Sequence, residues 1–193
     1  MEAIFGVSSL CKQPPPVSTS EFIKAGKELD KHLDVSIAGV GVLKYVRKHL
    51  TNASFFQSPS GSFITPMFFY LLRRIVVAHP HQRESVFQLL TDCFDLDTTL
   101  DVQSKVALRK SVLTQMLYLV YHGYIFPVVE KMFQYCLSID HSLIRHFITE
   151  LLDNMEPPYS TSFYDAVIRL LSTTAGKESL SVCPTPVLQF LGR

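Results

Sequence analysis

Apolar residues recur every three to four positions along most of this chain, a spacing that places them on one face of an α-helix. The pattern is clearest between residues 113 and 163. One helix there ends at Gly123, because glycine best adopts the left-handed conformation that closes a helix. A second begins near Pro127, a residue suited to a first helical turn. Asp140 is placed to cap a third helix, which Pro157 ends.

The same spacing predicts further helices on either side of this stretch. They span about residues 20–33, 35–50, 66–76, 80–94, 102–122 and 161–171. Residues 51–63 are rich in Ser, Gly and Pro and are predicted to form a loop, after which Thr65 caps and Pro66 opens the next helix. Gly39 and Gly41 each weaken the helix over 35–50 by up to about 1 kcal/mol relative to alanine. We interpret them as positions where a neighbouring helix approaches closely.

This pattern indicates an all-α protein with about nine helices and no convincing strand. Amphipathic helices joined by short connections are typical of an irregular HEAT-like helical stack, or α-solenoid, in which each layer buries the apolar face of its neighbour. The apolar stripe from Leu143 to Leu152 is interpreted as core rather than as a partner site. We expect the helical-repeat-like domain to span residues 20–172. A short helix and a Pro-rich loop over residues 1–19 precede it, and a loosely structured tail over residues 173–193 follows.

Composition excludes several classes of protein. Of the 193 residues, 47% are hydrophobic and 18% are charged, so most of the chain can form a packed core and is not disordered. The net charge of +1 predicts neither a nucleic-acid nor a membrane partner, so any basic surface must be local. No apolar run reaches the roughly 18 residues that a membrane span needs. The N-terminus lacks the basic region of a secretory signal, and no such signal is predicted.

Residue types that support catalysis or metal binding form no recognisable site. The four cysteines contain no CxxC pair, and we expect reduced thiols of an intracellular protein, with Cys93 and Cys136 on apolar helix faces. The seven histidines lack the spacing of a helical metal pair. No GxSxG, phosphate-binding loop or GxGxxG motif is present. These observations predict a protein without enzyme activity, metal or cofactor.

Three local clusters of basic residues are candidates for nucleic-acid contacts. They are Lys44, Arg47 and Lys48, then Arg73 and Arg74, then Lys105, Arg109 and Lys110. The first cluster has the spacing i, i+3, i+4, which places its members on one side of a helix. On successive helices of a solenoid such groups can follow a phosphate backbone. The alternative is an ordinary solvated helix face, which the residues alone favour.

Several ordered motifs resemble a known family. HGYIFPVV begins at His122, SLIRHFITELLD at Ser142 and PPYSTSF at Pro157, and GVLKYV lies upstream at residues 41–46. Together they resemble the C-terminal region of the C/D member of the negative elongation factor complex, the trihydrophobin family, over about residues 20–172. These are packing motifs, which identify a family rather than a chemistry. The sequence departs from the family at His122, where arginine is expected, and at Tyr45, where tryptophan is usual.

The resemblance implies a nuclear scaffold that acts by binding, without turnover. Its expected partners are the A and B subunits of the negative elongation factor complex, RNA polymerase II within that complex, and single-stranded RNA held by basic surface. The expected role is promoter-proximal pausing of the polymerase. Neither a membrane nor a small-molecule substrate is expected. Histidine in place of arginine at residue 122 weakens that part of the basic surface near neutral pH.

Other interpretations of the chain stay open. Family members carry further helices before the point that matches Met1, so a short isoform, a truncated gene model and a divergent copy all fit. We expect weaker binding to the A subunit and poor solubility of the chain alone. Two different functions compete with the pausing role: a generic α-solenoid adaptor with other protein partners, and a nucleic-acid-binding module that acts alone. A truncated, non-functional or dominant-negative isoform is a further alternative.

Overall fold

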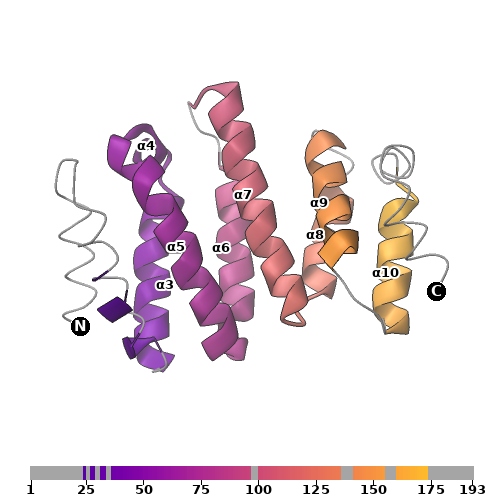
Figure 1. Cartoon of the computed structure of the whole chain (residues 1–193), viewed down its shortest axis with the longest axis horizontal. Helices are drawn as coiled ribbons and strands as arrows, with labels where there is room; N and C mark the ends of the chain where they lie inside the picture. The colour runs from indigo at the N-terminus through magenta and orange to yellow at the C-terminus, as the bar shows by residue number, and fades with distance from the viewer. Residues whose placement is uncertain are drawn as a thin grey trace. The chain divides into compact units, whose positions relative to one another are not determined.

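The computed structural model describes residues 24, 27–28, 31–33, 36–96, 100–135, 141–154 and 160–173. Over these residues the chain folds into eight α-helices and one 3₁₀ turn, with no strand (Figure 1). This confirms the predicted all-α class with helices packed on one another. The chain divides into two compact units, Met1–Lys105 and Val106–Arg193. Residues 1–19 and 174–193 lie outside the described part, and the predicted domain boundaries stay a prediction.

The first unit is built around three mutually packed helices. In chain order its elements are α3 (Ser36–Leu50), α4 (Ala53–Gln57), α5 (Pro59–Ala78), the 3₁₀ turn η1 (Pro80–Gln82) and α6 (Arg83–Asp95). α3, α5 and α6 contact one another, and Figure 1 shows α4 at the end that α3 and α5 share. Four apolar residues of α3 are buried, namely Val42, Leu43, Val46 and Leu50.

The start of α5 corrects the sequence analysis. The loop predicted over residues 51–63 is wrong, because α4 forms within it and α5 begins at Pro59 rather than at Pro66. Ser58 caps α5, since its hydroxyl oxygen accepts a hydrogen bond from the Gly61 amide at 3.0 Å. Pro59 takes the first helical position, where the missing N–H of proline is not needed. Ser58–Pro59 therefore supplies the same kind of start signal as Thr65–Pro66, one to two helical turns earlier.

Pro66 is accommodated inside α5 rather than at its start. Proline in a helix interior removes the hydrogen bond to the carbonyl four residues earlier, which costs about 3 kcal/mol or more when nothing compensates. Pro66 is exposed, so water reaches this turn of the helix. In the turn just before Pro66, the hydroxyl of Thr65 donates a hydrogen bond to the Gly61 carbonyl at 2.7 Å, a local contact separate from the one that Pro66 removes.

α3 and the end of α5 are interlocked at Gly39 and His79. A Cβ atom placed on Gly39 would lie only 2.7 Å from Cδ2 of His79. The imidazole is buried, and its Nε2–H donates a hydrogen bond to the Leu33 carbonyl. His79 also closes α5, since its backbone N–H donates to the Ile75 carbonyl at 2.8 Å. The close approach predicted at Gly39 is therefore confirmed.

The second unit is also built from helices. α7 (Val102–Tyr121) crosses the boundary between the units, and α8 (Phe126–Tyr135), α9 (His141–Asn154) and α10 (Thr161–Leu171) follow. α8 packs against α10. The hydroxyl of Tyr121 on α7 donates to the Glu150 carbonyl of α9 at 3.3 Å. The predicted stripe from Leu143 to Leu152 is core, because its apolar residues are all buried, namely Leu143, Ile144, Phe147, Ile148, Leu151 and Leu152.

The predicted helix end at Gly123 and the predicted helix start at residue 161 are confirmed in detail. Gly123 has a φ of 88°, and two amides turn back to close α7: Gly123 N–H to the Val120 carbonyl and Tyr124 N–H to the Leu119 carbonyl, each at 2.9 Å. Ser160 caps α10 by accepting a hydrogen bond from the Phe163 amide at 3.2 Å. The predicted cap at Asp140 and the predicted stop at Pro157 lie outside the described residues.

We expect Gly39→Ala to lower the free energy of unfolding by about 2 kcal/mol, because the new methyl group overlaps the buried His79 ring. Urea denaturation followed by circular dichroism measures the change. The matched control is the same substitution in a His79→Ala background, where the ring is gone. There Gly39→Ala should be neutral or stabilising by up to about 1 kcal/mol, as alanine favours helix. Simple addition of the two single costs would contradict the interlock.

Candidate nucleic-acid interface

The first basic cluster presents two exposed lysines on α3. The buried residues of this helix face α5 and α6, so the opposite stripe of Val40, Lys44 and Lys48 is exposed. Lys44 and Lys48 are four residues apart, which puts their stems about 5–6 Å from each other on one side of the helix. Both ammonium groups can therefore reach a ligand on that side without unfolding or rearranging the helix.

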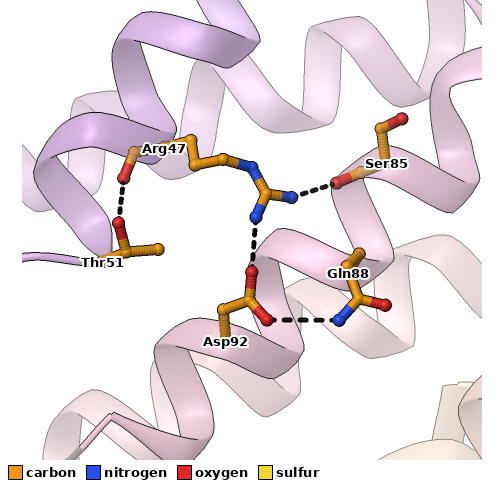
Figure 2. Close-up of polar contacts among 5 residues, drawn as sticks. All are labelled: Arg47, Thr51, Ser85, Gln88 and Asp92. Carbon is orange, nitrogen blue, oxygen red and sulfur yellow. Dashed lines mark hydrogen bonds and ion pairs between the residues drawn. The ribbon is translucent and has the colours of Figure 1, made fainter.

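Arg47 differs from its two neighbours, because its side chain joins α3 to α6 (Figure 2). Its Nη1 pairs with Oδ2 of Asp92, and its Nη2 donates to the Ser85 carbonyl at 3.4 Å. The second carboxylate oxygen of Asp92 accepts a hydrogen bond from Gln88 at 3.2 Å. At the main chain of Arg47, the Thr51 hydroxyl donates a hydrogen bond to the Arg47 carbonyl at 2.7 Å. A phosphate that approaches Arg47 would therefore meet a guanidinium whose charge Asp92 already partly neutralises.

The second cluster, on α5, does not point in one direction. Consecutive residues of an α-helix are about 100° apart, so Arg73 and Arg74 lie on either side of the exposed stripe formed by Pro66, Tyr70 and Val77. Both arginines are half-buried, and both interact with other groups of the chain. The pair is thus less accessible than Lys44 and Lys48.

The third cluster lies on the first turns of α7. Every residue from Val102 to Ser111 is exposed or half-buried, and burial of α7 begins only at Val112. Lys110 is exposed, whereas Lys105 and Arg109 are half-buried and interact within the chain. Lys105 belongs to the first unit and the other two to the second.

The two positions where the sequence departs from the resembled family are both ordered. The Tyr45 ring is half-buried and meets the Phe68 ring edge-on, with centroids 6.0 Å apart. Tyr45 therefore belongs to a cluster of rings that also contains His49, Phe55 and Phe68. The His122 ring is half-buried and lies 4.5 Å from the Tyr118 ring, centroid to centroid. His122 thus packs at the end of α7 as well.

Burial decides the chemistry of the one cysteine that the structure describes. Cys93 is buried and not in a disulfide, and burial, followed by the charge of Asp92, raises the pKa of its thiol to about 12. The thiol is therefore protonated at neutral pH and is a poor nucleophile. No group of three or more His, Cys, Asp or Glu within the described residues is placed to hold a metal ion. None of the described helices is long and apolar enough to cross a membrane.

We expect Arg47→Gln to destabilise the chain slightly, by about 0.5 kcal/mol at low salt, because the ion pair with Asp92 is about one third exposed and screened by water. Lys48→Gln, one residue away, should change the stability by much less. Urea denaturation of Arg47→Gln, of Asp92→Asn and of the double variant gives the coupling energy of the pair, with Lys48→Gln as the control. A coupling that is zero at low salt, or that grows with added salt, would argue against the pairing.

Comparison with known proteins places the chain in a family. The model of the family described as TH1 protein matches residues 1–183. Negative elongation factor D from Sus scrofa and its counterpart from Mus musculus are each 31% identical to the chain over 196 aligned residues. The alignments cover 98% of this chain but only 32% of each relative, so the chain spans about a third of their length. The resemblance predicted from the motifs is confirmed, and the chain belongs to the TH1 protein family.

Proposed function

We propose that this chain is a non-catalytic subunit of a negative elongation factor complex. It contributes in the nucleus to promoter-proximal pausing of RNA polymerase II. It does so by binding the A and B subunits, and through them the polymerase, without turning over a substrate. The observation that carries this proposal is the 31% identity to negative elongation factor D across 98% of the chain.

The structure supports a binding role in two ways. The described helices bury their apolar stripes against one another, which leaves their outer faces available to partners. The one described cysteine, Cys93, is buried and protonated at neutral pH. Function in such a protein depends on which groups its outer helix faces present to partners.

Single-stranded RNA is the second ligand that we propose, and Lys44 and Lys48 are its main contacts. These two lysines are exposed on one side of a buried helix, whereas Arg47 between them is paired with Asp92. Lysine acts as a point charge toward phosphate, so the contacts should be independent of base sequence. Lys110 offers a further exposed ammonium group on α7. Arg73, Arg74, Lys105 and Arg109 are weaker candidates, because they interact within the chain.

The proposal predicts that the tagged chain recovers the A and B subunits and RNA polymerase II from nuclear extract, as identified by mass spectrometry. The matched control carries Leu143→Asp and Phe147→Asp, which place charges in the buried stripe of α9 and should unfold the second unit. Recovery by the parent chain but not by the control would exclude binding through non-specifically exposed apolar surface. If the folded parent chain recovers other proteins and none of these partners, it is a generic adaptor.

We also expect the chain to bind a labelled, unstructured RNA with an affinity that falls steeply as salt rises. The slope of log K against log salt is negative, and each lost phosphate contact on a single strand reduces its magnitude by about 0.7. In a fluorescence anisotropy titration, the double variant Lys44→Gln, Lys48→Gln should therefore make this slope less negative by about 1.4.

Arg47→Gln is the control on the same helix, because its charge is already paired with Asp92. It should leave the slope nearly unchanged. If both variants lost the same salt dependence for each charge removed, the net charge of α3, rather than these two lysines, would decide the binding. A flat salt dependence of the parent chain would exclude phosphate recognition.

A further inference from the structure

α8 and α10 lie side by side in parallel and form a groove between them. Phe126 and Ser162, at the N-terminal ends of the two helices, both line it. Towards the C-terminal ends, Arg169 of α10 contacts Glu130 and Phe133 of α8. The groove has a volume of about 610 Å³. Its lining residues are Phe126, Pro127, Val129, Glu130, Phe133, Ser162, Asp165, Ala166 and Arg169.

Apolar groups make up most of the groove. Phe126 is 56% exposed, although it belongs to a helix whose Val128 and Met132 are fully buried. Ala166, a small residue of α10, also lines the groove. Exposed aromatic surface beside a concave wall is typical of sites that bind another protein.

The groove has three charged residues, of which two form an ion pair and one carries an unbalanced negative charge. Nη1 of Arg169 lies 3.2 Å from Oε2 of Glu130, and its guanidinium lies 4.4 Å above the Phe133 ring. Arg169 and Glu130 thus neutralise each other. Asp165 is exposed and forms no ion pair with any described residue. One carboxylate therefore remains on the edge of an otherwise neutral, apolar groove.

We propose that the α8–α10 groove binds an amphipathic helix of a partner protein that presents a large apolar side chain next to a lysine or arginine. The apolar side chain would cover Phe126 and Ala166, and the cation would pair with Asp165. A nucleic acid is disfavoured here, because the two carboxylates and one guanidinium give the lining a negative formal charge. Helix-in-groove binding of this kind uses anchors spaced along one helix face. The groove does not depend on the identity of the complex proposed above.

The probe for the test is a fluorescein-labelled, helix-prone peptide of alanine and glutamine with two leucines and one arginine on one face. We expect its fluorescence anisotropy to saturate with the intact chain in the micromolar range. Phe126→Ser should weaken the binding about tenfold, which corresponds to about 1.4 kcal/mol. Serine is tolerated at the start of a helix, so this exposed position should accept it without loss of fold. Tyr70→Ser, at a similarly exposed aromatic on α5, is the matched control and should leave the affinity unchanged.

A charge exchange tests the role of Asp165. Asp165→Lys should weaken binding of the arginine peptide about threefold, the range of an exposed ion pair. A second peptide with glutamate in place of the arginine should show the reverse order, binding Asp165→Lys better than the parent chain. Lys44→Gln, Lys48→Gln should bind the arginine peptide like the parent chain, which separates this site from RNA binding.

Two outcomes would overturn the proposal. The first is that neither peptide binds the folded parent chain. The second is that binding occurs but Phe126→Ser and Tyr70→Ser weaken it equally, because the peptide then binds exposed apolar surface in general. Failure to recover elongation-factor subunits from nuclear extract would leave these titrations unaffected, so the two proposals can fail separately.

Discussion

The packing of the first unit depends on one close contact, that between Gly39 of α3 and the buried imidazole of His79. Glycine leaves room for the ring, and the N–H of the ring satisfies the Leu33 carbonyl that meets it. Together the two requirements set how far α3 can slide along α5. The positions of Lys44 and Lys48 on the outer face of α3, and the reach of Arg47 to Asp92 on α6, follow from that register.

Most features that could be predicted from the sequence are decided by neighbouring residues, although the close approach predicted at Gly39 involves His79 on another element. The stop at Gly123 and the start of α10 beside Ser160 rest on hydrogen bonds within a turn or so, and the apolar stripe of α9 follows from the helical spacing of its residues. The start of α5 escaped prediction because Ser58–Pro59 and Thr65–Pro66 give equivalent start signals, and local patterns cannot rank them. In the sequence, Arg47 shares its charge and helical spacing with Lys44 and Lys48, so no local pattern distinguishes it from them. Its partner Asp92 lies 45 residues later, on another helix.

The chain presents two chemically different outer faces on separate units. The exposed lysines of α3 suit a negatively charged polymer, and the α8–α10 groove suits an apolar helix with a positive charge. The groove was not visible in the sequence, because its two walls come from separate helices with all of α9 between them in the chain. The exposed Phe126 in the first turn of a strongly amphipathic helix was the one local signal for it.

Pro66 also has a consequence for how α5 comes apart. The missing hydrogen bond divides α5 into a first segment, Pro59 to Thr65, and a second segment that ends at the His79 interlock. Local unfolding of α5 that begins at Ser58 can stop at Pro66, because the series of backbone hydrogen bonds along the helix is already interrupted there. The first segment and α4 thus form a low-cooperativity part of the fold, able to open while the second segment holds α3 in register. Mechanical or thermal stress on this end of the unit would then be absorbed locally, before it reaches the face that carries Lys44.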